Sequence, residues 1–473
     1  MLTLYTPATG FPDLEVKIAY GLARVGIEAF GINSVKIIPQ HGFYEIFLNG
    51  SFDKLNATFN RITGRILSSP YLSQITPGIT SSSAKGIIAE EGETFDLSIY
   101  SKINPLAQNR PSENFCRHTS RSKISNVLGL TAVATTGVLC KRDGVDITFY
   151  KGQPRRPTEP RDLCKTCGLI ALLGMWYATF IFNIADKEVV VIPIPTEEVS
   201  GSKLQQIFAL QHQIRKKWFS QIIPQVLIPL IFLSKIPSSG DILAGFDLFI
   251  VVLSRQQGYH VDGIQIISID NYINFIKANS FNNASIDIML QNKAYSSLHE
   301  LNNLIYYGTK ESLLKFARLY VQETSTNNFI NLLYPETTKY FLKEVAMISK
   351  DIIENPSLQS LARTLRYFIR ERKYGYADDI RNARKNSKDF EDTIAKMLRE
   401  GELRRVQQEQ DKKAGKNIEN RIHLPKVNEI EEVFKLIEND FEATKTALVI
   451  LAFSFPSTED KDKKDINENV NQQ

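Results

Sequence analysis

Cysteine is scarce in this chain, and the usual marks of secretion are missing. Four of its 473 residues are cysteine, which is too few for the disulfide framework that stabilises many secreted domains. The N-terminal sequence MLTLYTPATGFPDLE has neither the basic start nor the apolar stretch of a signal peptide. We therefore expect a cytoplasmic protein, whose 43% of hydrophobic residues can form large cores in two or more domains.

Long apolar runs are also missing. Residues 168–185 hold no charged residue and approach the roughly 20 residues that cross a bilayer, but they include two glycines and Asn183. Residues 221–236 are broken by Pro224 and Pro229. We interpret the first run as a buried helix, or a helix followed by a strand, and expect no membrane span.

Motifs that bind nucleotides or carry out catalysis are absent. The sequence contains no G-x-x-x-x-G-K-[ST] loop, no G-x-G-x-x-G after a strand, no H-E-x-x-H and no G-x-S-x-G. YADD, which ends in Asp378 and Asp379, resembles the paired aspartates that hold metal ions in polymerase palm domains, but helical patterns enclose it. We expect a protein that is not an enzyme. The alternative is a nucleic-acid enzyme that uses these two aspartates.

The four cysteines suggest a metal site. Cys164 and Cys167 form a C-x2-C knuckle, whose spacing lets two sulfur atoms converge on one ion. Cys116 and Cys140 would complete a structural zinc site, with His118 able to replace one of them. Two other interpretations stay open: a redox pair at the start of a helix, and buried cysteines that act as small hydrophobic residues.

The cysteines lie in a strongly basic segment. The formal charge of the whole chain is only +5, but residues 110–165 hold eleven basic residues and five acidic ones. Stretches such as GQPRRPTEPRD are too polar and too rich in proline to form a core, so their arginines face solvent or a polyanion. The alternative is a solvated basic loop. The candidate nucleic-acid contacts are Arg117, Arg121, Lys123, Arg155, Arg156 and Arg161.

The hydrophobic pattern changes near residue 340. Before it, PDLEVKIAYGLARVGIEAFG predicts a helix, VKIIP, YEIFLNG, VDITFYKG and KEVVVIPIP predict strands, and FDLFIVVLSRQQGYHVDGIQIISI predicts a hairpin. After it, segments such as PSLQSLARTLRYFIRERK and SKDFEDTIAKMLREGELRRVQQEQDKK predict helices. We therefore expect an α+β fold. A mixed α/β N-terminal body (1–339) contains the basic segment with its cysteine knuckle insertion (110–167). A C-terminal helical bundle (340–456) and a disordered polar tail (457–473) follow.

The predicted bundle is basic as well. Arg363, Arg366 and Arg370 follow one another at helical spacing, which places them in a row that can follow a phosphate backbone. Tyr374 and Tyr376 come just after this helix, where an aromatic ring can stack on an unpaired base. The alternative is a solvated helix face whose charges pair with one another. The other candidate contacts are Arg372, Lys373, Arg381, Arg384 and Lys385.

The order of these parts resembles a known family. An opening helix ending in KIAYGLARVGIE, a basic segment that runs into LCKTCGLIALLG, and a bundle with SLARTLRYFIRERKYGYADDIRNARK are together similar to the large subunit of archaeal type I-A CRISPR effector complexes (Cascade). The similarity covers most of the chain. Large subunits of type I-B complexes also carry cysteine knuckles and terminal bundles.

The resemblance implies a non-catalytic subunit of an antiviral defence complex. Such subunits bind near the 5′ end of the guide RNA, recognise the short motif that flanks the target in double-stranded DNA, and present the opened target to a helicase–nuclease. Base pairing then supplies the sequence specificity, while the protein contacts backbones and a short groove. The partners expected are guide RNA, target DNA, the other subunits and the helicase–nuclease. The remaining alternative is a structural subunit of another assembly without nucleic-acid contact.

Overall fold

The computed structural model forms two compact units, Met1–Asp270 and Asn271–Gln473. It describes residues 1–7, 12–67, 94–103, 149–150, 153–154, 165–184, 187–214, 218–219, 224–236, 239–255, 259–385, 388–418 and 420–456. The named strands all lie in the first unit, whereas the described part of the second unit is helical apart from one isolated β-bridge. The predicted α+β fold is confirmed.

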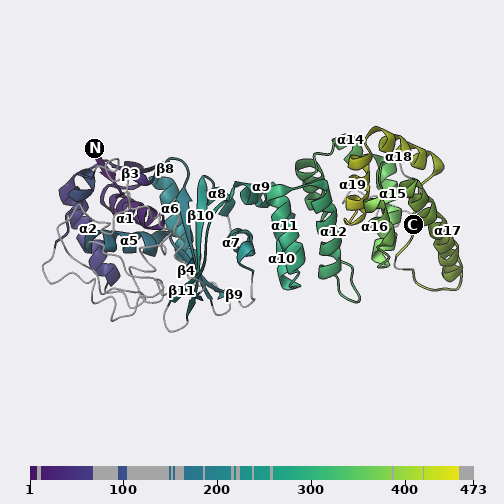
Figure 1. Cartoon of the computed structure of the whole chain (residues 1–473), viewed down its shortest axis with the longest axis horizontal. Coiled ribbons are helices and arrows are strands. Elements are labelled where there is room, and N and C mark those ends of the chain that lie inside the picture. Colours follow the sequence, from purple (N-terminus) through teal and green to yellow (C-terminus); the bar gives the residue numbers. More distant parts are fainter. Residues whose placement is uncertain are drawn as a thin grey trace, which may run out of the picture. The chain divides into compact units, whose positions relative to one another are not determined.

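A four-stranded antiparallel sheet opens the first unit. Its order is β1-β3-β2-β8, built from β1 (Leu2–Tyr5), β3 (Phe43–Leu48), β2 (Val35–Gln40) and β8 (Val199–Ser200). Gly42, at a φ of 85°, makes the tight turn between β2 and β3. The predicted helix α1 (Pro12–Phe30) packs against this sheet (Figure 1). The neighbouring helical segments are η1 (Ile32–Ser34), α2 (Phe52–Leu67) and η2 (Leu97–Ser101).

A second, five-stranded sheet has the order β11-β10-β7-β6-β9. Strands β10 (Phe246–Arg255) and β11 (Tyr259–Ser268) form the predicted hairpin, with an irregularity in register between Val252 and Leu253. All neighbours are antiparallel except β6 and β9. The other elements of this part are β6 (Phe180–Ile184), β7 (Lys187–Pro195), β9 (Trp218–Phe219), α6 (Gly201–Ile214), η5 (Gln225–Leu227), α7 (Ile228–Lys235), α8 (Ser239–Ile242) and the short pair β4 (Phe149–Tyr150) and β5 (Gln153–Pro154).

The apolar run after the cysteine knuckle is helix α5 (Lys165–Ala178), followed by strand β6. Helix α5 packs against α1 so closely that the two backbones touch. A Cβ atom on Gly174 would lie 1.8 Å from the carbonyl oxygen of Lys17, and one on Gly21 would lie 2.1 Å from that of Ile170. Both positions therefore require glycine. Within the described residues, no helix combines the length and the apolar character needed to cross a membrane.

Helix α1 carries two charges into the core of the first unit. The Asp13 and Lys17 side chains are each 1% exposed, with 3.0 Å between Oδ2 and Nζ. Burial raises the pKa of Asp13, which Lys17 partly offsets, and burial lowers the pKa of Lys17. The other carboxyl oxygen of Asp13 has no hydrogen-bond partner among the described residues. Removing one partner of an ion pair that is buried so deeply strongly destabilises the fold, because the remaining charge has no compensation.

The second unit begins earlier than the sequence suggests. The division falls after Asp270, not after residue 339, because strand structure ends with β11 and the helices that follow belong to the second unit. The first of them are α9 (Asp270–Ala278), α10 (Ser280–Gln291), α11 (Tyr295–Tyr307), α12 (Lys310–Thr324), α13 (Pro335–Tyr340), the π-helix η6 (Phe341–Val345) and α14 (Lys350–Ile353). Of the helices that follow, α15 (Pro356–Arg370) and α17 (Asp389–Lys413) were predicted from the sequence, whereas α16 (Gly375–Asn382) was not. The last two are α18 (Val427–Asn439) and α19 (Phe441–Ala452).

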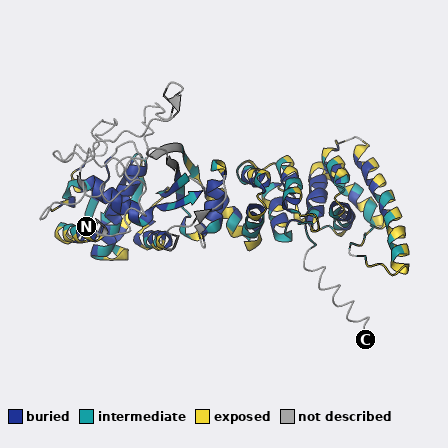
Figure 2. Ribbon diagram, turned by 90° about the horizontal axis from the view of Figure 1, so that it is seen from below, coloured by how far each residue is buried: buried dark blue, intermediate teal, exposed yellow. Residues whose placement is uncertain are grey.

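The helices of the second unit bury one face and expose the other (Figure 2). Phe275, Phe316 and Phe341 are fully buried, and the ring of Phe341 contacts the other two rings in the core between α9, α12 and η6. Helix α15 packs against α18 and α19. This packing fixes the positions of the basic side chains on α15.

Candidate nucleic-acid interface

Most of the residues predicted in the basic segment lie outside the described part of the chain. These are Cys116, Cys140, Cys164, His118, Arg117, Arg121, Lys123, Arg155, Arg156 and Arg161. Cys167 is described, and it is buried in α5, where the hydroxyl of Tyr100 donates a hydrogen bond to its Sγ at 3.1 Å. In the described residues, no group of three or more His, Cys, Asp or Glu side chains is arranged to hold a metal ion. The zinc site stays a prediction.

Helix α15 places the three predicted arginines. It begins at Pro356, and the side chain of Asn355 caps it by accepting hydrogen bonds from the backbone amides of Ser357 and Leu358. Leucine and phenylalanine side chains cover its buried face. The arginine positions fall on the other side, and all three side chains are half-buried. Helical spacing makes them a row, and the packing makes that row part of the wall of the bundle. The three arginines are Arg363, Arg366 and Arg370.

Each arginine of the row has a distinct environment. Nη2 of Arg366 donates to the backbone carbonyl of Leu451 at 2.8 Å, which ties α15 to α19. Burial lowers the pKa of Arg370. Arg363 lines a cavity together with Arg366. The row is therefore not a freely solvated strip of charge.

This cavity, which we call the arginine cavity, has a volume of about 350 Å³. Lys339 from α13 and Arg363 and Arg366 from α15 line it, together with Gln359 and Glu354. Lys339 is exposed and makes no ion pair within the described residues, whereas Glu354 pairs with Lys350 at 3.5 Å. Three cations face one carboxylate, and guanidinium groups match the geometry of phosphate oxygens. The arginine cavity is suited to hold a phosphate group.

The basic residues after α15 mostly stabilise the second unit. Arg372, at a φ of 59°, donates to the carbonyl of Thr326. Nζ of Lys373 lies 2.6 Å from Oε1 of Glu400 on α17. Arg381 lies 3.7 Å from Asp378. Arg384 and Lys385, the last two basic residues of this stretch, are exposed.

Both tyrosines of KYGYADD, which forms the start of helix α16, are engaged in packing. The guanidinium carbon of Arg318 lies 3.8 Å from the ring centroid of Tyr374, and the ring of Phe453 lies parallel to it with 6.5 Å between centroids. The hydroxyl of Tyr376 donates to Oε2 of Glu400 at 2.5 Å. Burial and this hydrogen bond raise the pKa of Tyr376 to about 12. Base stacking on either ring would compete with these contacts.

Asp378 takes part in a charge cluster. Its two carboxyl oxygens lie 3.2 Å from Nη2 of Arg318 and 3.7 Å from Nη1 of Arg381. Burial lowers the pKa of Arg318, and Asp378 opposes that shift. Asp379 is exposed and makes no ion pair within the described residues. The arrangement uses Asp378 to neutralise a largely buried arginine, which is a structural task.

Sequence reasoning missed Lys339. It lies in PETTKYFLK, just before the predicted bundle, and it belongs to no run of basic residues. The fold brings it to the same cavity as the two arginines, which lie on α15.

A scan of the sequence against protein-family models finds no match, and a search of curated proteins finds no match either.

Proposed function

We propose that this chain is a non-catalytic, nucleic-acid-binding subunit of a type I CRISPR surveillance complex. In this role it binds the guide RNA and the flanking duplex of the target DNA, and it presents the opened target to a separate helicase–nuclease. The observation that carries the nucleic-acid part is the meeting of Lys339, Arg363 and Arg366 at the arginine cavity. Phosphate contacts of this kind position a strand without reading its sequence.

The assembly part of the proposal rests on the resemblance of the three sequence segments to the type I-A large subunit. The placement of Asp378 between Arg318 and Arg381 supports a subunit without its own catalytic site, because that carboxylate already has a structural partner. The basic segment with its cysteines would add a zinc-stabilised surface for the duplex flank.

Co-purification tests the proposal. The tagged chain, isolated from its native cells, should carry short RNAs of uniform 5′ sequence, together with several other proteins in fixed ratio. A chain with Lys339→Gln and Arg363→Gln should retain less RNA, while the exposed control Lys396→Gln should retain the wild-type amount. Isolation of a stable assembly that contains no RNA would favour a structural subunit of another kind.

A further inference from the structure

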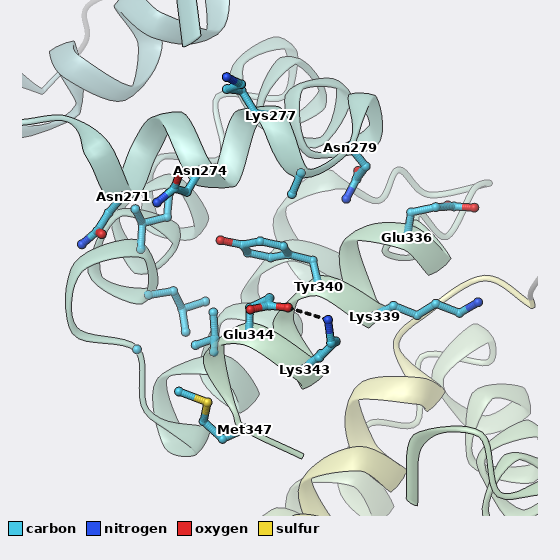
Figure 3. Close-up of a pocket in the computed structure, with 15 residues that line it drawn as sticks. Asn271, Asn274, Lys277, Asn279, Glu336, Lys339, Tyr340, Lys343, Glu344 and Met347 are labelled. Carbon is cyan, nitrogen blue, oxygen red and sulfur yellow. Dashed lines mark ion pairs between the residues drawn. The ribbon is translucent and has the colours of Figure 1, made fainter. Parts of the chain in front are cut away.

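A second cavity in the second unit is larger than the arginine cavity. It has a volume of about 970 Å³ and lies between α9, the end of α11, α13 and η6. We call it the asparagine cavity (Figure 3). Its volume is at the upper end of the range of about 300–1,000 Å³ found for small-molecule sites. Lys339 lines both cavities.

One wall of the asparagine cavity is the polar face of α9. Asn271 and Asn274 are exposed, at a three-residue spacing that places both on one side of the helix, next to the face that buries Tyr272 and Phe275. Within the described residues, neither of the two asparagine side chains makes a hydrogen bond. Each carboxamide offers two donor hydrogens and an acceptor oxygen. This is the chemistry that reads the edge of a nucleobase.

The opposite wall presents an aromatic ring. Tyr340 extends into the cavity with its hydroxyl on the side of Asn274 (Figure 3). Edge-to-face contacts with Phe275 and Phe341, at 5.4 and 5.7 Å between centroids, hold the ring in place. Burial and the nearby Glu344 raise the pKa of Tyr340, so its hydroxyl keeps its proton at neutral pH. A fixed aromatic ring is a surface on which a base can stack.

The floor of the cavity has an unusual backbone conformation and carries several charged side chains. It is formed by the π-helix η6, and Met347, just beyond it, is 83% exposed at a φ of 53°. π-helical turns and left-handed non-glycine residues are found preferentially at functional sites. Lys343 pairs with Glu344 at 2.9 Å, while the exposed Lys339 has no ion-pair partner among the described residues. The lining holds three lysines and two glutamates, Glu336 and Glu344, so it has a small excess of positive charge.

We propose that the asparagine cavity receives one unpaired nucleotide of a single-stranded nucleic acid. The base packs against Tyr340, its edge hydrogen-bonds to Asn271 and Asn274, and its phosphate lies at Lys339. An unpaired nucleotide is required because a paired base has its hydrogen-bonding edge covered by its partner. The inference rests on the proposed function, and it adds a base-contacting site to the phosphate contacts of the arginine cavity.

A strand carrying a fluorescent base tests the inference. Oligothymidylate with a single 2-aminopurine is titrated with the full-length chain, and both affinity and the change in 2-aminopurine emission are measured. Wild-type protein should change the emission, as stacking does. Tyr340→Leu should weaken affinity roughly 5- to 150-fold and remove the emission change, while Tyr340→Phe should keep it. Asn271→Ala with Asn274→Ala should weaken binding and reduce the preference among bases.

The asparagine variants guard against a folding artefact, because both side chains are exposed and their removal leaves the core unchanged. Gln291→Ala, an exposed amide outside the cavity, is the matched control and should bind like wild type. If the strand binds with unchanged affinity and emission in the Tyr340→Leu chain and in the double asparagine variant, the nucleotide site is wrong and the proposed function stands. If the wild-type chain binds no strand, both proposals are wrong.

Discussion

Replacing Asp378 with asparagine tests whether the role of this aspartate is structural or catalytic. The substitution keeps the size of the side chain and removes its charge, so Arg318 loses its only ion-pair partner in the described part of the chain. Nη1 of Arg318 is already buried there without a hydrogen-bond partner. The remaining positive charge would then be poorly compensated.

The exposure of the pair sets the size of the effect. The Arg318 and Asp378 side chains are 19% and 30% exposed, so the pair is intermediate between surface pairs, worth about 0–1 kcal/mol, and fully buried ones, whose disruption costs about 3–5 kcal/mol. We expect Asp378→Asn to reduce the free energy of unfolding of the second unit by about 1–3 kcal/mol. Asp379→Asn, at the exposed neighbour, should change it by no more than about 0.5 kcal/mol.

Hydrogen exchange with mass spectrometry measures this locally. Amides of α12 and α16 should exchange roughly 5 to 150 times faster in the Asp378→Asn chain and at the wild-type rate in the Asp379→Asn chain. Neither the wild-type chain nor these variants should hydrolyse DNA, RNA or ATP in isolation. The structural assignment would be refuted by metal-dependent turnover that Asp378→Asn abolishes while exchange rates stay at the wild-type level.

Three further predictions concern charge and metal. Lys17→Met strands a buried carboxylate and should destabilise the first unit by roughly 3–5 kcal/mol, whereas Lys36→Met, at a 56% exposed side chain, should cost about 0–1 kcal/mol; tryptophan fluorescence reports this, since both tryptophans lie in the first unit. Hydrogen bonds from Lys373 and Tyr376 lower the pKa of Glu400 below 4.5, so its contribution to stability is present above pH 4.5 and is lost as the pH falls through the lowered pKa. The urea midpoint of the Glu400→Gln chain should therefore depend less on pH between 3 and 6 than that of the wild type. An unchanged pH profile would show that this carboxylate does not stabilise the unit. If the cysteines share a zinc, elemental analysis should find about one equivalent, and Cys164→Ser should lose both metal and solubility; a metal-free chain of normal stability would count against the site.

The fold was predictable where the hydrophobic residues follow the period of a helix or of a strand. The amphipathic pattern of PDLEVKIAYGLARVGIEAFG predicted α1, and the strand residues on both sides of RQQGYH predicted the β10–β11 hairpin. The domain boundary was not predictable from the same pattern. Residues 271–339 were assigned to the mixed body, yet they form helices of the second unit, because helical periodicity does not show which neighbours a helix packs against.

The site shows the same limit for side chains. Spacing placed Arg363, Arg366 and Arg370 in one row, but it could not show that the carbonyl of Leu451, 85 residues further along, would bind Arg366. Lys17 is a parallel case. An Asp and a Lys four residues apart are typical of a solvated helix face, but this pair is buried, and α5 lies directly against the backbone of Lys17.

The salt dependence of strand binding tests the central claim most directly. The affinity of fluorescein-labelled single-stranded RNA and DNA is measured by anisotropy between 50 and 200 mM salt for three chains of confirmed fold: wild type, Lys339→Gln with Arg363→Gln, and the control Lys396→Gln. A phosphate site at the arginine cavity predicts weaker binding by the double variant and a log–log slope that is shallower by about 0.7 for each phosphate that the variant no longer neutralises, equally for all sequences. The control should keep the wild-type slope. Identical affinities and slopes in all three chains would contradict the account and leave a structural subunit without nucleic-acid contact as the better description.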